Sequence, residues 1–209
     1  MNVLSIDFDI IMAPDINLYN DMVGTSPDGE RSIETRIQQY PLLNGCRADL
    51  NHYQRLVTYI LEVIQSLNVE DIRISFSHED IKNTLQGLED VHIYSIDHHH
   101  DLGYFQPNKD PNEAEDHCSC ANWGECFFNK GVITSFTWLN NNNSGPLPPQ
   151  WENKINVVDL QDVEFNTLPL MNKLFICLSP EWVPKMYHPL FFLILDLINQ
   201  DKGCTLELH

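Results

Sequence analysis

Short apolar runs typical of strands alternate along this chain with segments of helical periodicity. Strands are predicted over residues 3–9, 72–76, 91–96, 131–139, 155–160 and 174–178. Helices are predicted over residues 50–67, 79–88, 121–129 and from Pro189 onward. Strands that alternate with helices favour a parallel sheet with helices packed on it. We therefore expect an α/β protein with three layers (α/β/α) and a mainly parallel sheet.

The length of the chain suits a single domain with a full core. Its 209 residues predict one domain over residues 1–209. No run of roughly 18 apolar residues is present, so we expect no membrane span. The first residues enter a strand-like segment with no basic region before it, so we expect no signal peptide. The six cysteines are then expected to be reduced thiols of a cytoplasmic protein.

The net charge of −18 limits the choice of partners. Nucleic acids and anionic membranes would be repelled, whereas a cationic substrate or a basic peptide would be attracted. The acidity could equally serve solubility, or part of it could belong to carboxylates that bind metal ions. No pattern in the sequence predicts an oligomeric state.

Residues 12–48 contain several prolines and glycines and show little periodicity. Loop-rich segments of this length in a compact domain are usually functional. We expect this segment to cover the active face, with a short helix near residues 33–39.

Acidic residues and histidines follow three of the predicted strands. Asp7 and Asp9 come at the end of the first strand, His78 follows the second, and the stretch from Asp97 to Asp101 follows the third. The carboxyl ends of parallel strands meet at one edge of a sheet, where ligands bind. We therefore expect these side chains to gather at that edge.

Residues 97–101 read Asp-His-His-His-Asp. If the chain stays extended beyond the strand, the side chains of Asp97, His99 and Asp101 share one face, and those of His98 and His100 point elsewhere. A solvated polar turn is the alternative interpretation.

The combined set of four carboxylates and two imidazoles indicates a metal site. It consists of Asp7, Asp9, His78, Asp97, His99 and Asp101. Six ligands would crowd a single ion, whereas two divalent ions would balance four aspartates. Oxygen-rich ligation with two imidazoles suits Mn²⁺, with Fe²⁺, Co²⁺ or Zn²⁺ as alternatives. We expect two Mn²⁺ ions.

These residues resemble the motifs of the arginase and agmatinase (ureohydrolase) superfamily. Its D-x-H-x-D motif matches residues 97–101, its S-x-D-x-D motif matches residues 5–9, and its remaining histidine matches His78. The chain departs from the family in three ways. The S-x-D-x-D strand comes first, as in a circular permutation; Phe76-Ser77 replace a Gly-Gly pair; and the chain is shorter than typical members. An arginase-like fold is implied.

The small size fits a compact branch of this superfamily, the peptide arginases, which act in the maturation of ribosomally made peptides. The resemblance implies two Mn²⁺ ions and hydrolysis of arginine side chains within a peptide to ornithine and urea. It also implies that Asp101 relays a proton to the leaving amine, with a role as ligand only as the alternative. For substrate binding we single out Glu181, His100 and Asn122, with Glu30 and Glu34 as rivals of Glu181 for the guanidinium.

Three other functions stay open. The enzyme could act on free arginine or agmatine. It could be a haloacid-dehalogenase-type phosphatase that uses Asp7 and Asp9, or a non-catalytic, metal-dependent peptide-binding module. A separate zinc site at His117, Cys118, Cys120 and Cys126 is not expected, because the C-x-C-x5-C spacing is not that of common structural zinc sites.

Overall fold

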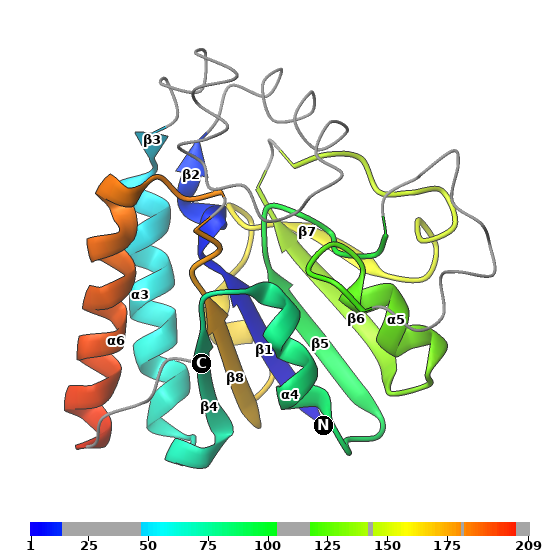
Figure 1. Cartoon of the computed structure of the whole chain (residues 1–209), viewed down its shortest axis with the longest axis horizontal. Helices are drawn as coiled ribbons and strands as arrows, with labels where there is room; N and C mark the ends of the chain where they lie inside the picture. Colours follow the sequence, from blue (N-terminus) through cyan, green and yellow to red (C-terminus); the bar gives the residue numbers. More distant parts are fainter. Residues whose placement is uncertain (14–46, 104–117, 142–143, 181, 204–209) are drawn as a thin grey trace.

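The computed structural model describes residues 1–13, 47–103, 118–141, 144–180 and 182–203. Six parallel strands form its sheet, in the order β4-β8-β1-β5-β6-β7 (Figure 1). Their bounds are β1 Asn2–Asp7, β4 Ile72–Ser75, β5 Val91–Ile96, β6 Ile133–Asn140, β7 Asn156–Asp159 and β8 Lys173–Cys177. The predicted α/β class with a parallel sheet is thus confirmed.

The first strand ends two residues earlier than predicted. β1 stops at Asp7, and the 3-10 helix η1 (Phe8–Ile11) begins directly after it. The reason is local, because the Asp7 carboxylate accepts a hydrogen bond from the backbone N–H of Asp9 and so caps the helical turn. Asp9 therefore lies on a turn and not on the strand.

Within the described ranges, four α-helices connect or follow these strands. They are α3 Leu50–Gln65, α4 Ile81–Leu85, α5 Trp123–Asn129 and α6 His188–Lys202. Asp49 caps α3 by accepting hydrogen bonds from two backbone N–H groups of its first turn. The predicted helix over 79–88 is shorter, because a 3-10 turn, η4 (His78–Asp80), takes up its start. As predicted, Pro189 lies in the first turn of the last helix.

Two clusters of buried side chains divide the core. Successive residues of β1 belong to opposite clusters, because side chains along a strand alternate between its two faces. Leu4 and Ile6 pack with side chains of α3 and α6, whereas Val3 packs with side chains of α4 and α5. Helices α3 and α6 lie side by side (Figure 1). The three-layer stacking and the arginase-like character of the fold stay predictions.

Only the ends of the loop-rich segment are described. Strand β2 (Met12–Ala13) pairs antiparallel with β3 (Arg47–Ala48) as a small second sheet. The predicted short helix near residues 33–39 lies outside the described residues. None of the helices in the described ranges is both long enough and apolar enough to cross a membrane.

The cysteines depart from the prediction of reduced thiols, because Cys118 and Cys126 form a disulfide. Residue 118 precedes α5 and residue 126 lies on it, so the bridge ties the preceding turn to the helix. The sequence spacing alone does not reveal this pairing, since it depends on the helix folding back over the turn. His117, the fourth residue of the rejected zinc pattern, lies outside the described residues.

Candidate metal centre

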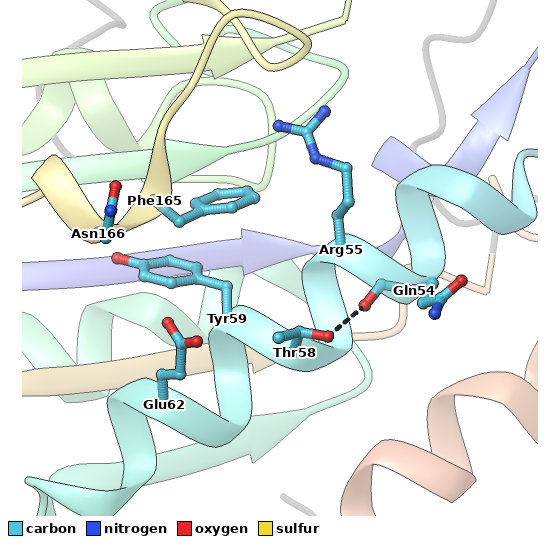
Figure 2. Close-up of a pocket in the computed structure, with 7 residues that line it drawn as sticks. All are labelled: Gln54, Arg55, Thr58, Tyr59, Glu62, Phe165 and Asn166. Carbon is cyan, nitrogen blue, oxygen red and sulfur yellow. Dashed lines mark hydrogen bonds between the residues drawn. The ribbon is translucent and has the colours of Figure 1, made fainter.

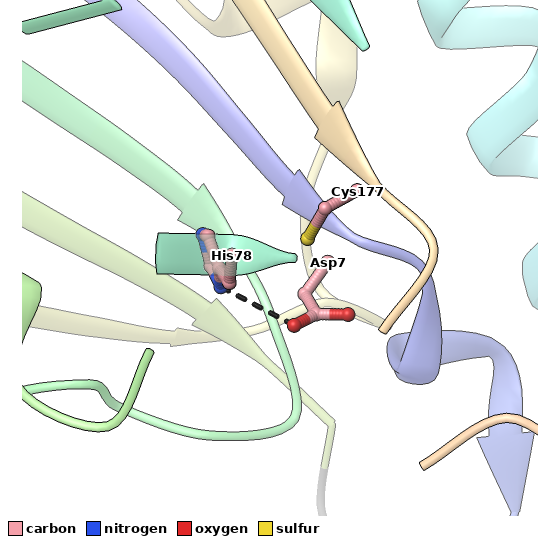
Figure 3. A group of neighbouring side chains, drawn as sticks. All are labelled: Asp7, His78 and Cys177. Atoms are coloured by element: carbon pink, nitrogen blue, oxygen red, sulfur yellow. Dashed lines mark ion pairs between the residues drawn. The ribbon is translucent and has the colours of Figure 1, made fainter. Parts of the chain in front are cut away.

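The parallel sheet brings the predicted acidic residues and histidines to one edge. Asp7 is the last residue of β1, Asp97 follows β5 directly, and His78 opens the turn after β4. The carboxyl ends of these strands lie at the same end of the sheet. Asp7 and His78 face one another there, although 70 residues separate them in the sequence (Figure 3).

The stretch after β5 is turned and not extended, so the predicted reason for the convergence was wrong. The Asp97 carboxylate accepts a hydrogen bond from the backbone N–H of His99 over 2.7 Å. Asp101 adopts a left-handed backbone conformation with φ of +51°. Asp97, His99 and Asp101 still come together, but two local turns bring them there.

On one side of the cluster, His78 faces three carboxylates. Its Nδ1 atom lies 3.2 Å from Asp7 Oδ2, 3.1 Å from Asp97 Oδ2 and 2.9 Å from Asp101 Oδ2. Its other ring nitrogen, Nε2, lies 2.8 Å from the hydroxyl of Ser5, which fixes the ring. His78, Asp97 and Asp101 form a buried group whose atoms could hold one metal ion.

On the other side, His99 is the imidazole. Its Nδ1 atom lies 2.8 Å from Asp9 Oδ2 and 3.9 Å from Asp97 Oδ1. Asp9, Asp97 and His99 form a second buried group that could hold a metal ion. Asp97 thus belongs to both groups and presents one oxygen to each side.

Burial and mutual repulsion perturb these groups strongly. The pKa of Asp97 is raised well above its ordinary value, first by burial and then by the charges of Asp101 and Asp7. Burial and the charge of Asp7 likewise raise the pKa of Asp9. Burial lowers the pKa of His78, but the nearby Cys177 and Asp101 outweigh it, so that the pKa lies well above its ordinary value.

The donor set fits divalent metal ions. Among the described residues, no lysine or arginine pairs with any of the four aspartates, although all four are at least 96% buried. In the same part of the chain, the buried Nδ1 of His78 and Oδ2 of Asp97 make no hydrogen bond. One ring N–H cannot serve three carboxylates, whereas a cation between them attracts all three. The structure therefore supports a metal site at this edge of the sheet.

Several residues that hold the cluster in place were not predicted to do so. Ser179, just after β8, donates a hydrogen bond from its hydroxyl to Asp7 Oδ2 over 2.6 Å. Asn141, just after β6, lies with its Oδ1 3.1 Å from His98 Nδ1. Both residues follow strand ends, so the rule that located the metal ligands could have located them as well. His98 is in neither of the two groups above.

Trp123 holds Asp101 from α5. Its indole Nε1–H donates a hydrogen bond to Asp101 Oδ2 over 2.7 Å, and the ring is fully buried. The helix can approach this closely because residue 124 is glycine. A Cβ atom there would lie 3.0 Å from the Asp101 backbone oxygen, tighter than most such contacts. This role of Trp123 was not predicted from the sequence.

Of the predicted substrate-binding residues, the structure describes His100 and Asn122, and both side chains accept hydrogen bonds from neighbouring residues of the chain. His100 is 3% exposed, and its Nδ1 accepts a hydrogen bond from the backbone N–H of Leu102. Burial lowers the pKa of His100 to about 4, so the ring is neutral. Asn122 accepts hydrogen bonds through its side-chain oxygen from Ser119, in the turn before α5. Glu181, Glu30 and Glu34 lie outside the described residues.

A pocket of about 410 Å³ lies elsewhere, between α3 and the connection from β7 to β8. Tyr59 of α3 and Phe165 stack in it with ring centroids 4.3 Å apart (Figure 2). It shares no residue with the metal-ligand cluster. No motif in the sequence indicates this pocket.

Comparison of the chain with protein-family models, with curated proteins and with solved structures finds no match.

Proposed function

We propose that this protein is a hydrolase with two metal ions that converts arginine side chains within a peptide to ornithine and releases urea. The observation that carries the proposal is the position of Asp97, which two buried groups of ligand-type side chains share. A carboxylate shared between two imidazole-containing groups suits a pair of neighbouring ions. The resemblance of residues 5–9, 78 and 97–101 to ureohydrolase motifs suggests the reaction.

The ligands divide naturally between two positions. His78 and Asp101, with Asp7 close by, would hold the first ion, Asp9 and His99 would hold the second, and Asp97 would contact both. We propose Mn²⁺ for this pair because carboxylate oxygens dominate the donor set. When bound, the two ions supply Lewis acidity, which activates water and stabilises negative charge that develops on the substrate.

The residues of the chain orient the reacting groups. Ser5 fixes the ring of His78, Ser179 fixes Asp7, and Trp123 fixes Asp101. In the proposed reaction, Asp101 accepts the proton of the attacking water and delivers it to the departing nitrogen of the guanidinium.

The charge of the chain agrees with a cationic substrate. A net charge of −18 attracts the guanidinium of an arginine-rich peptide and repels phosphate esters. The phosphatase alternative also gives roles only to Asp7 and Asp9, and leaves the other four members of the buried cluster without one.

The test is a turnover experiment with the Mn²⁺-loaded protein. Arginine-containing peptides, free arginine, agmatine and a phosphate monoester are incubated separately, and urea, phosphate and peptide mass are measured. We expect urea and the mass loss of ornithine formation with a peptide. An Asp97→Asn variant should be inactive, whereas Asp162→Asn, outside the cluster, should behave as the wild type.

The remaining outcomes separate the alternatives. Urea from the free compounds alone would replace the peptide substrate with a small guanidino compound, and phosphate release would favour the phosphatase. A peptide that binds only with metal but keeps its mass would favour a binding module.

A further inference from the structure

Cys177 lies beside the metal-ligand cluster and has no part in the mechanism above. It is the last residue of β8 and is paired with Asp7 at the end of β1. Residues directly opposite one another on neighbouring strands point to the same face of a sheet. Cys177 and Asp7 accordingly project toward His78, as Figure 3 shows. The cysteine side chain is fully buried.

The spacing of these three side chains suits coordination of one ion. A carboxylate oxygen of Asp7, a ring nitrogen of His78 and the sulfur of Cys177 all lie within 4.8 Å of one another. Ligand atoms around a tetrahedral zinc ion are roughly 3.3 to 3.6 Å apart, given bond lengths of about 2.0 to 2.3 Å. Small side-chain movements would close the difference.

A second observation points to a cation at the same place. Nδ1 of His78 and Oδ2 of Asp97 are buried and make no hydrogen bond to any described residue, while they lie 3.1 Å apart. Buried ligand-type atoms that lie this close without a hydrogen bond are what a cation between them would hold together. The sulfur of Cys177 lies 3.6 Å from the hydroxyl of Ser179, which is a weak polar contact.

The sulfur makes the two sides of the cluster chemically different. The group around His99 contains only carboxylates and an imidazole, Asp9, Asp97 and His99. On the His78 side, a further group that shares His78 consists of Asp7, His78 and the thiol of Cys177. Thiolate ligands favour Zn²⁺, Co²⁺ and Fe²⁺, whereas oxygen ligands favour Mn²⁺.

We infer that Cys177 is a ligand of the ion on the His78 side, and that this position selects Zn²⁺, Co²⁺ or Fe²⁺ over Mn²⁺. The His99 side would then keep the preference for Mn²⁺, and the centre would hold two different metals. This inference rests on the proposed metal centre and changes its composition on one side. The competing interpretation is that Cys177 is a buried thiol that only packs in the core.

X-ray absorption at the zinc edge tests the inference on the wild-type protein loaded with one equivalent of Zn²⁺. A ligating Cys177 gives a sulfur scatterer at about 2.3 Å from the zinc. The Cys177→Ser variant should lose this scatterer and keep the shell of nitrogen and oxygen. The matched control Cys120→Ser, which removes a thiol outside the cluster, should retain it.

Competition between metals provides a second measurement. We expect the ratio of Zn²⁺ to Mn²⁺ affinity at one of two positions to fall at least tenfold in Cys177→Ser, with the other position unchanged. Co²⁺-loaded wild type should also show a sulfur-to-cobalt charge-transfer band that this variant lacks.

The outcomes separate this inference from the proposed function. Two bound ions with nitrogen and oxygen ligands alone would overturn the role of Cys177 and leave the hydrolase proposal standing. A protein that binds no divalent ion would overturn both. Because the absorption experiment uses the wild-type protein, its result does not depend on the folding of the variant.

Discussion

The aspartates of the cluster repel one another when no cation is present. Two like charges about 4 Å apart cost roughly 4 kcal/mol at an effective dielectric constant near 20. Asp97 experiences this repulsion from Asp101 and Asp7, and burial removes the water that would relieve it. Bound cations would turn the same side chains from a source of instability into one of stability.

Asp97→Asn should therefore abolish stabilisation by metal. At 100 times the dissociation constant, a ligand raises the free energy of unfolding of the wild type by about 2.7 kcal/mol. The variant loses the carboxylate shared by both groups, so Mn²⁺ should no longer raise its unfolding free energy. Thermal or urea unfolding with and without Mn²⁺ measures this change. If Mn²⁺ raised the unfolding free energy of the variant as much as that of the wild type, Asp97 would not bind the ions. Asp162→Asn provides the control.

Trp123→Phe removes the hydrogen bond to Asp101 and keeps an aromatic ring in the core. Hydrogen bonds to charged groups contribute about 1.5–3 kcal/mol. If Asp101 relays the proton, kcat should fall about tenfold or more while KM and metal content change little. Steady-state kinetics and metal analysis check this. Trp151→Phe is the matched control, because its buried indole donates to the backbone oxygen of Leu102 instead. An equal fall in kcat in both variants would reduce the effect of Trp123 to packing.

At the scale of elements, α5 matters because it carries Trp123 to the cluster. The disulfide between Cys118 and Cys126 links the start of this segment to the helix. A bridge that closes a short loop of this kind contributes about 2–3 kcal/mol in the chain-entropy model. The element thus combines a covalent tie with the hydrogen bond to Asp101.

The double variant Cys118→Ser/Cys126→Ser should lose about 2–3 kcal/mol of unfolding free energy under non-reducing conditions. Cys120→Ser should lose much less, because Cys120 is not in the bridge. Denaturant unfolding measures both, and digestion without reductant should yield a linked peptide pair from the wild type. Recovery of the two cysteines as thiols would contradict the bridge.

The existence of the main elements followed from local patterns, whereas their details depended on side chains. The alternation of strands and helices identified all six strands of the sheet and its parallel class. The early end of β1 escaped prediction because the carboxylate of Asp7 caps a turn. Strand order also escaped it, since β8 joins the sheet between β4 and β1 from the far end of the chain.

The candidate site followed from one rule about strand ends. Because that rule concerns parallel strands, it brought Asp7, His78 and Asp97 together without knowledge of strand order. The rule does not predict contacts between side chains of different elements, so it did not predict the hydrogen bond from Trp123 to Asp101. The turn through His99 depends on a bond between a side chain and the backbone that periodicity does not reveal.

Over the whole molecule, the net charge of −18 should accelerate the capture of cationic peptides. The screening length falls from about 30 Å at 0.01 M salt to about 3 Å at 1 M. We expect kcat/KM for an arginine-rich peptide to fall several-fold as salt rises, with kcat nearly constant. A peptide with acidic residues around the target arginine should show a weaker or reversed dependence. Equal salt dependence for both peptides would contradict electrostatic attraction.

The proposed function depends above all on Asp97 lying between two metal ions at the carboxyl edge of the sheet. Anomalous diffraction from a crystal saturated with Mn²⁺ tests this position most directly. Because saturation fills a position even where another metal binds more tightly, we predict two manganese peaks about 3.5–4 Å apart, one beside His78 and the other beside His99, with Asp97 contacting both. A single peak, no peak, or peaks remote from these histidines would contradict it.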